Sequence, residues 1–221
     1  MSWESTVTYY QLLNRDIKHR LGGLHSAKII LVSVDFAEIE QLQHQGNWQQ
    51  AGEILSQAAQ SLEAAGADFF LICTNTMHKV AEQVSASVSI PLLHIADATG
   101  ETLIENNIKT VGLLGTRFTM QEDFYKKRLK DRFQIKVIVP TEAEQNLLHD
   151  IIYQELCLGK INDKSRQIYL QIMQRLAAQG AQGIILGCTE IGLLVQQNNC
   201  SCPLFDTAVI HAGRAVTLAL S

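Results

Sequence analysis

The chain has 221 residues, 47% of them hydrophobic and 18% charged, with a net charge of −4 at pH 7. This composition is typical of a globular protein with one large domain or two small ones. The lack of a basic patch argues against nucleic acid and anionic membranes as partners, and the apolar runs are far too short to span a bilayer.

The cysteines indicate the compartment in which the protein works. There are five of them, an odd number, and the opening MSWESTVTYY has neither the basic nor the apolar region of a secretion signal. Both features favour reduced thiols in the cytoplasm over a disulfide framework. Cys200 and Cys202 lack the second CxxC or the paired histidines of a tetrahedral metal site, so we expect no metal.

Short β-like runs alternate with longer helical ones, which is typical of α/β folds with mostly parallel strands. In the first half we expect three strands, at 27–36, 67–73 and 89–97. Apolar residues recur at helical spacing from Ala51 to Ala65, where Gly66 closes the helix, and a second helix is expected at 77–86.

The second half continues the alternation. We expect four strands there, at 109–116, 135–140, 183–188 and 202–208. An amphipathic helix is expected at 120–132, two more include 147–156 and 168–177, and a final helix follows the last strand.

The two halves repeat one pattern, because ADFFLICTNT (67–76) matches AQGIILGCTE (181–190) and IPLLHIADA (90–98) matches CPLFDTA (202–208). We therefore expect two similar parallel-sheet α/β domains, one formed by 1–98 with 208–221 and one by 99–207. The strand at 109–116 has no counterpart ahead of MSWESTVTYY. The first strand of the N-terminal domain is thus expected to be missing, a shortfall of about ten residues.

Each half ends a buried strand in small polar residues around a Cys-Thr pair. Ligands of parallel α/β sheets lie at the carboxyl ends of strands, so two such units facing each other would place Thr74 and Cys188 on opposite walls of a cleft. Thr and Asn side chains with helix N–H groups would cradle a carboxylate there. Inverting a stereocentre beside that carboxylate requires one acid–base group on each face, and the positive end of a helix can lower the pKa of a thiol.

Several segments together resemble the cofactor-independent aspartate/glutamate racemases over essentially the whole chain: MSWEST, RLGGLHSAKIILVSVDF, CTNTMHKVA, HIADATG, GLLGTRFTM and GCTEIGLL. The resemblance implies two α/β domains with pseudo-twofold symmetry, an active site in the cleft between them, no pyridoxal phosphate, no metal and commonly a homodimer. Aspartate racemases typically have Cys-Asn-Thr where this chain has Thr74-Asn75-Thr76. The catalytic pair is then Thr74 and Cys188, as in a subgroup similar to the L-aspartate/glutamate-specific racemases.

The resemblance also suggests substrate-binding residues. Asn75, Thr76 and Thr189 are candidates for the substrate carboxylate, although each could equally cap a helix. Glu190, where related glutamate racemases usually have His, is expected to orient Cys188 or bind the substrate ammonium, or else to satisfy the helix dipole.

Three further candidates come from the family pattern. Gln43 and Lys160 would select the substrate side chain, although spacing alone makes both ordinary surface residues. Met1 would line the cleft. The other titratable side chains are interpreted as packing or incidental: His78, His94, His211, Cys73, Cys157, Cys200 and Cys202.

The sequence thus predicts racemisation of aspartate or glutamate by Cys188 and Thr74 on opposite faces of Cα. Two alternatives remain open. In the first, a single-thiol decarboxylase or isomerase of the same superfamily, Cys188 alone protonates an enediolate. In the second, the chain is an N-terminally truncated, weakly active or inactive relative that binds an acidic ligand or nothing.

Overall fold

The structure, a computed structural model, describes residues 1–221 and divides the chain into two units. The first consists of Met1–Ile95 and His211–Ser221, and the second of Ala96–Ile210. None of the helices combines the length and the apolar composition needed to cross a membrane.

The elements in chain order are α1 (Trp3–Leu21), α2 (Phe36–Gln45), α3 (Trp48–Ala64), η1 (Thr76–Val80), α4 (Ala81–Ser85), α5 (Ile95–Glu105), β1 (Thr110–Gly115), α6 (Arg117–Gln121), α7 (Asp123–Phe133), β2 (Lys136–Ile138), α8 (Glu142–Gln154), η2 (Leu156–Leu158), α9 (Asp163–Ala178), β3 (Ile184–Gly187), α10 (Ile191–Leu194), η3 (Gln197–Asn199), β4 (Leu204–Asp206) and α11 (Thr207–Ala219).

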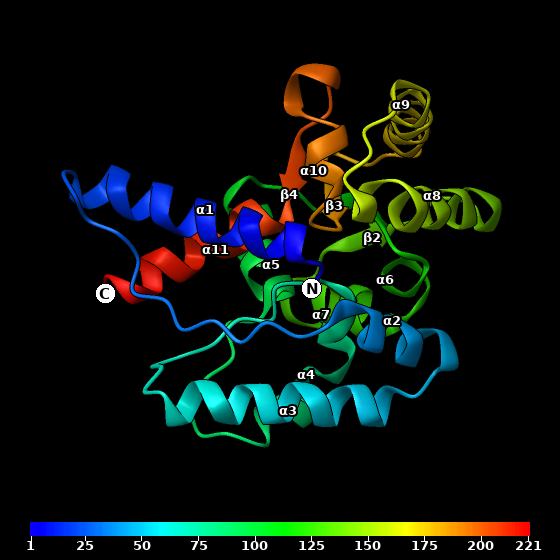
Figure 1. Cartoon of the computed structure of the whole chain (residues 1–221). Coiled ribbons are helices and arrows are strands. Elements are labelled where there is room, and N and C mark those ends of the chain that lie inside the picture. Colours follow the sequence, from blue (N-terminus) through cyan, green and yellow to red (C-terminus); the bar gives the residue numbers. More distant parts are fainter. The chain divides into compact units, whose positions relative to one another are not determined.

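The second unit is built on a four-stranded parallel sheet with the strand order β2-β1-β3-β4 (Figure 1). β1 is central, since Gly112 pairs with Ile138 of β2 and with Ile184 of β3. Strands covered on both faces are nearly continuous apolar runs, which is why TVGLLG and IILG were recognisable as strands. The α/β class expected from the sequence is confirmed.

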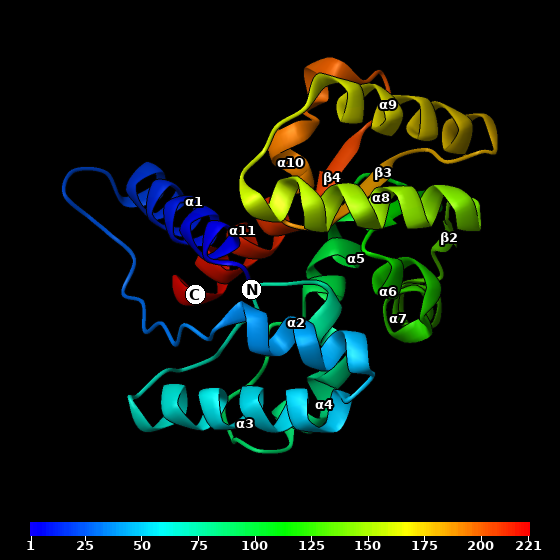
Figure 2. The same cartoon turned by 45° about the vertical axis from the view of Figure 1, so that its right-hand side comes forward.

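Helices α8 and α9 pack side by side on one face of this sheet (Figure 2). Leu114 and Leu186 point toward them and join a buried cluster with Leu148 and Tyr169. Gly112 lets α9 approach, because a Cβ there would lie 2.7 Å from the Ile184 side chain and 3.0 Å from that of Leu176. This packing fixes the strands whose ends carry Cys188.

The first unit holds a separate apolar cluster between α2, α3 and the chain from Phe70 to Val84. It has one isolated parallel bridge in place of a sheet, between Phe70 and Leu92. The N–H of Phe70 donates to the carbonyl of Pro91, and the N–H of Leu93 donates to the carbonyl of Phe70, both at 3.0 Å.

The strands predicted at 27–36, 67–73 and 89–97 were therefore wrong as regular strands. Residues 25–35 run from α1 to α2 as an extended stretch without an arrow in Figure 1. A strand exists only where a neighbour accepts and donates its backbone hydrogen bonds, and residues 28–34 make none. The apolar pattern was present, but the pairing partner was not.

The helix predicted at 120–132 is divided in two. Glu122 adopts an extended conformation (φ −78°, ψ 157°), which ends α6 and begins α7. The C-cap of α7 is Gln134, with φ at 56°.

Candidate active site

The predicted site residues fall into two groups, one in each unit. In the second unit, β1 and β3 end at paired glycines, Gly115 and Gly187. A Cβ on Gly187 would lie 2.8 Å from the carbonyl oxygen of Leu114, and one on Gly115 would lie 2.9 Å from that of Gly187. Only glycine fits this close approach. The next residues, Thr116 and Cys188, thus leave the sheet from neighbouring strand ends.

Cys188 is linked to the two residues that follow it. Its Sγ donates to Oε2 of Glu190 at 3.0 Å, and the hydroxyl of Thr189 donates to the same oxygen at 2.7 Å. All three residues are buried. The structure thus joins three of the predicted residues into one hydrogen-bonded group, in which the Glu190 carboxylate accepts from both the thiol and the hydroxyl.

The thiol of Cys188 is held in its protonated form. Burial, and then the carboxylate of Glu190, raise the pKa of Cys188 well above its ordinary value. The lowering of a thiol pKa by a helix end, which the sequence suggested, is not found here, because the thiol is buried, the carboxylate lies against the sulfur and α10 has only four residues. The group presents a buried proton donor next to a proton acceptor.

Tyr169 was not predicted, yet it belongs to the surroundings of the thiol. Its hydroxyl is buried without a hydrogen-bond partner, and burial, followed by the proximity of Cys188, raises the pKa of Tyr169 well above its ordinary value. Spacing along α9 identifies Tyr169 only as a core position. Lys160, by contrast, is exposed in the turn after η2, and the structure gives its ammonium no hydrogen bond or ion pair with the Cys188 group.

In the first unit, Thr74 follows the extended segment that carries the bridge at Phe70. Its N–H donates to the carbonyl of Ile72 at 2.8 Å, which forms a tight turn. Thr74 is half-buried, and the N-cap residue of η1 is Asn75, so Thr74 does not occupy the capping position.

The amino group of Met1 donates to the carbonyl of Cys73 at 2.8 Å, and the hydroxyl of Ser5 donates to the same oxygen at 3.1 Å. The start of α1 is thus attached to the residue before Thr74. The Met1 side chain packs against the apolar cluster of this unit.

Asn75, Thr76 and Gln43 are buried around η1. Asn75 is the N-cap residue of η1 but makes no capping bond from its side chain. Gln43 lies in α2, where its Nε2 is 3.0 Å from the sulfur of Met77. The interpretation of Gln43 as an ordinary surface residue was wrong. Gln43 is buried against Met77, which lies 34 residues further along the chain, and the local sequence around Gln43 does not reveal such a contact.

Three histidines lie behind Thr74. The rings of His78 and His94 are 4.4 Å apart, and that of His211 is 6.1 Å from His78. Nδ1 of His78 donates to the Thr74 carbonyl at 2.8 Å, so its Nε2 accepts the N–H of Ile95 at 3.2 Å. His78 therefore anchors the Thr74 turn as a neutral ring, a positioning role that the sequence did not reveal.

His211 makes stability depend on pH. Its Nε2 donates to the Leu93 carbonyl and its Nδ1 accepts the Tyr9 hydroxyl, both at 2.8 Å, while burial lowers the pKa of His211 to about 4. The unfolded chain, with a histidine pKa of about 6.5, binds this proton at a higher pH. The free energy of unfolding should therefore fall by roughly 3 kcal/mol between pH 6.5 and 4 from this group. Urea unfolding across that range should be flatter for His211→Gln; parallel curves would contradict the assignment.

Histidine, cysteine and acidic side chains do not gather in threes anywhere in the structure in a way that could hold a metal ion. All five cysteines are free thiols.

The family assignment rests on comparison with known proteins. The family model for Asp/Glu/Hydantoin racemases matches residues 1–215. The chain belongs to this family. A curated member of similar sequence is the broad specificity amino-acid racemase RacX of Bacillus subtilis, which is 27% identical over 164 residues, 74% of this chain and 70% of RacX.

Solved structures of this racemase family share the fold. A protein assigned to the Asp/Glu racemases from Yersinia pestis is 54% identical, with a TM-score of 0.93, and the match covers 100% of this chain and 96% of that one. An aspartate racemase homologue from Pyrococcus horikoshii is 33% identical, with a TM-score of 0.85, over 99% and 95% of the two chains. The chain is therefore an amino-acid racemase by family.

Proposed function

We propose that the protein racemises aspartate or glutamate without pyridoxal phosphate, with Cys188 and Thr74 acting on opposite faces of the substrate Cα. The observation that carries the proposal is the buried thiol of Cys188, which donates to the carboxylate of Glu190 at 3.0 Å. An acid–base group of this kind must both give and take a proton, and this pair provides a donor and an acceptor in contact.

The protons balance as follows. Glu190 accepts the thiol proton, and the resulting sulfur anion removes the Cα proton from one face of the amino acid. The hydroxyl of Thr74 returns a proton to the other face, which gives the mirror-image product. Glu190 then releases its extra proton to water and Thr74 takes one back from water, which restores the starting protonation state. A substrate ammonium beside the sulfur would offset the effect of the Glu190 carboxylate and lower the pKa of Cys188, so that the anion forms with substrate bound.

The substrate-binding roles extend the same proposal. Asn75, Thr76 and Thr189 bind the α-carboxylate, and Gln43 and Lys160 select the side chain. We further propose a homodimer in the cytoplasm, where the free thiols would persist.

The single-thiol alternative also has an observation in its favour. A thiol held protonated by burial and by Glu190 is suited to protonate an enediolate once, without help from Thr74. The two reactions differ in stereochemistry. Racemisation exchanges the Cα proton and inverts the centre, whereas a single-thiol reaction on one face leaves aspartate uninverted.

The deciding experiment incubates the protein with L-aspartate, and separately with L-glutamate, in D2O. We expect both deuterium at Cα, seen by mass spectrometry, and the D-enantiomer, seen by chiral chromatography. The rates should be unchanged after dialysis against a chelator or treatment with hydroxylamine, because the proposed steps use only side chains. Exchange without inversion would support the single-thiol reaction, and loss of activity restored by a divalent ion would overturn the cofactor-free mechanism.

A further inference from the structure

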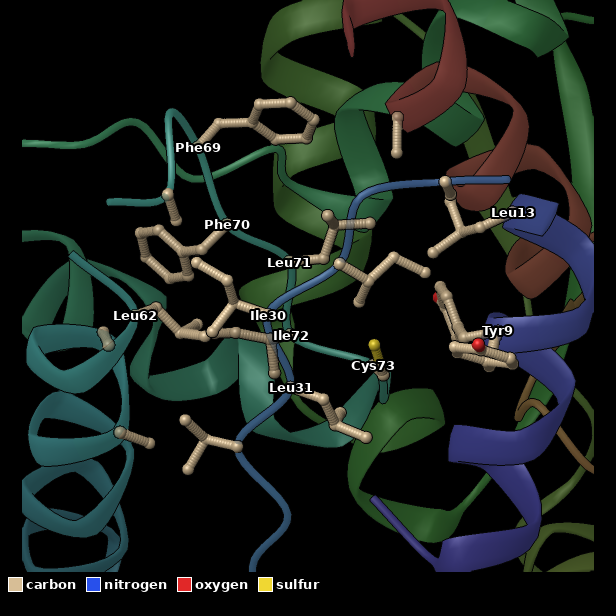
Figure 3. A pocket seen from close by; sticks show the side chains of 18 of the residues that line it. Tyr9, Leu13, Ile30, Leu31, Leu62, Phe69, Phe70, Leu71, Ile72 and Cys73 are labelled. Carbon is tan, nitrogen blue, oxygen red and sulfur yellow. The ribbon is translucent and has the colours of Figure 1, made fainter. Parts of the chain in front are cut away.

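One of the buried tyrosines differs from the others in its hydrogen bonding. Tyr9, beside the apolar cavity of the first unit that Figure 3 shows, donates its hydroxyl to Nδ1 of His211 at 2.8 Å. Tyr125 in α7 donates to the hydroxyl of Thr99 at 3.2 Å. The hydroxyl of Tyr169 is equally buried but has no hydrogen-bond partner. An unpaired buried hydroxyl destabilises a fold, so this one needs an explanation.

Tyr169 and Cys188 face the same layer of the second unit. Ile184, Leu186 and Cys188 all belong to the apolar cluster that α8 and α9 cover, as expected of residues two apart along an extended chain. Tyr169 joins the same cluster from α9. The side chain of Cys188 therefore points toward the helix that carries the unpaired hydroxyl.

The two residues also lie at the same level along the sheet. Leu176 of α9 lies over Gly112 and Ile184, since a Cβ on Gly112 would be 3.0 Å from the Leu176 side chain and 2.7 Å from that of Ile184. The connection from α9 to β3 is short, so the helix and the strand run in opposite directions. Tyr169 precedes Leu176 by seven residues, which places it about 10 Å along the helix on the same face. Cys188 follows Ile184 by four residues, about 13 Å in the same direction. A long helical side chain leans toward the N-terminus of its helix, which brings the hydroxyl of Tyr169 to the level of the sulfur.

The protonation states explain why the hydroxyl has no partner. Burial, and after it the proximity of Cys188, raise the pKa of Tyr169 well above its ordinary value, so the tyrosine keeps its proton. In the resting protein the thiol of Cys188 donates to Glu190, and a neutral thiol is only a weak acceptor. Once the proton has passed to Glu190, the sulfur is an anion and a strong acceptor.

We propose that Tyr169 is a positioning residue, whose hydroxyl donates to the sulfur of Cys188 when that sulfur has lost its proton to Glu190 and holds the anion in place for the substrate Cα. Tyr169 acts through Cys188, so this role rests on the proposed acid–base function of that thiol. No proton leaves the tyrosine, because only its hydrogen bond forms and breaks in each cycle. Pairing of the hydroxyl favours the anion over the resting thiol.

The test is Tyr169→Phe, which removes the hydroxyl and keeps the ring. The rate at which iodoacetamide alkylates Cys188, measured by mass spectrometry at several pH values, reports the fraction of sulfur anion without any substrate. We expect this rate to fall about ten-fold or more, as the loss of a hydrogen bond to a charged group would produce. Cys202, a half-buried free thiol in the same samples, is the internal reference and should react at an unchanged rate. A role in packing alone would leave the alkylation of Cys188 unchanged or, by loosening the core, make it faster.

Racemisation provides a second measurement. Tyr169→Phe should lower kcat about ten-fold and leave KM unchanged, because the hydroxyl contacts the sulfur and not the substrate. Without the hydroxyl the pKa of Cys188 rises further, so the anion forms at higher pH. The deficit in kcat should therefore shrink as the pH is raised.

Tyr125→Phe is the matched control. It removes a buried hydroxyl that has a partner, so the melting temperature should fall by about 2–4 °C while alkylation and kcat stay unchanged. Tyr169→Phe loses no hydrogen bond in the resting protein, so its melting temperature should not fall.

Three outcomes would overturn the role of Tyr169. One is alkylation of Cys188 that is unchanged or faster in Tyr169→Phe. Another is a melting temperature that falls as far as in Tyr125→Phe, which would show that the hydroxyl has a partner in the resting protein. The last is a rise in KM with kcat unchanged. A protein that racemises neither aspartate nor glutamate would contradict the proposed function, whereas the alkylation rates would still decide whether Tyr169 stabilises the sulfur anion.

Discussion

Cys188→Ala should abolish racemisation and exchange of the Cα proton together, lowering kcat by about 10²–10⁴-fold, the usual contribution of a general acid or base. The reason is geometric, since the sulfur is the proton carrier that Glu190 contacts at 3.0 Å. Alanine keeps the small apolar side chain at a position only 8% exposed, so the fold should remain. Chiral chromatography and deuterium incorporation measure the loss, and a thermal melt checks the fold.

Cys202→Ala provides the matched control. Cys202 is partly buried against the same apolar cluster as Cys188, but it is not at a strand end. Its removal should leave the rate unchanged. The assignment fails if Cys188→Ala retains more than about a tenth of the activity, or if Cys202→Ala loses as much.

The sequence predicted the second unit far better than the first. The strand predicted at 109–116 is Thr110–Gly115, and that at 183–188 is Ile184–Gly187. Each is a short apolar run that neighbours pair on both sides, so pattern and pairing agree. AKIILVSVDF (27–36) has an equally strong pattern but no neighbour. A strand forms only beside a neighbouring strand that can pair with its backbone. The apolar pattern of a single segment does not show whether such a neighbour is present.

The candidate site shows a similar division. Thr189 and Glu190 were predicted beside Cys188 because they follow it in sequence, and the structure joins all three. The direction of the thiol pKa was not predictable, since it depends on burial and on which oxygen faces the sulfur. The histidine ring behind Thr74 was missed for the same reason: His78 reaches the Thr74 turn and Ile95 at once only in the folded unit.

Thr74 should prove to be the second acid–base group. Its hydroxyl follows the extended segment at the position that matches Cys188 in the repeat, and the N-cap residue of η1 is Asn75 and not Thr74. Thr74→Ala should therefore lower the rate in both directions by about 10²-fold or more. Thr74→Ser, which keeps the hydroxyl, should lose much less. Equal losses in the two variants would assign Thr74 a packing role.

Thr74→Cys tests the chemistry of that position more sharply. A threonine hydroxyl is far less acidic than a thiol, so it is the poorer proton carrier, and a thiol pair should be faster. The two enantiomers have equal free energies, so kcat/KM must be the same in both directions whatever the residues are. A weak second group cannot make the reaction one-way; it slows both directions and lets kcat and KM differ separately. We expect Thr74→Cys to raise kcat with D-aspartate or D-glutamate at saturating substrate, with kcat/KM rising equally for the L-enantiomer. A folded variant that is no faster with the D-enantiomer would show that Thr74 does not carry the second proton.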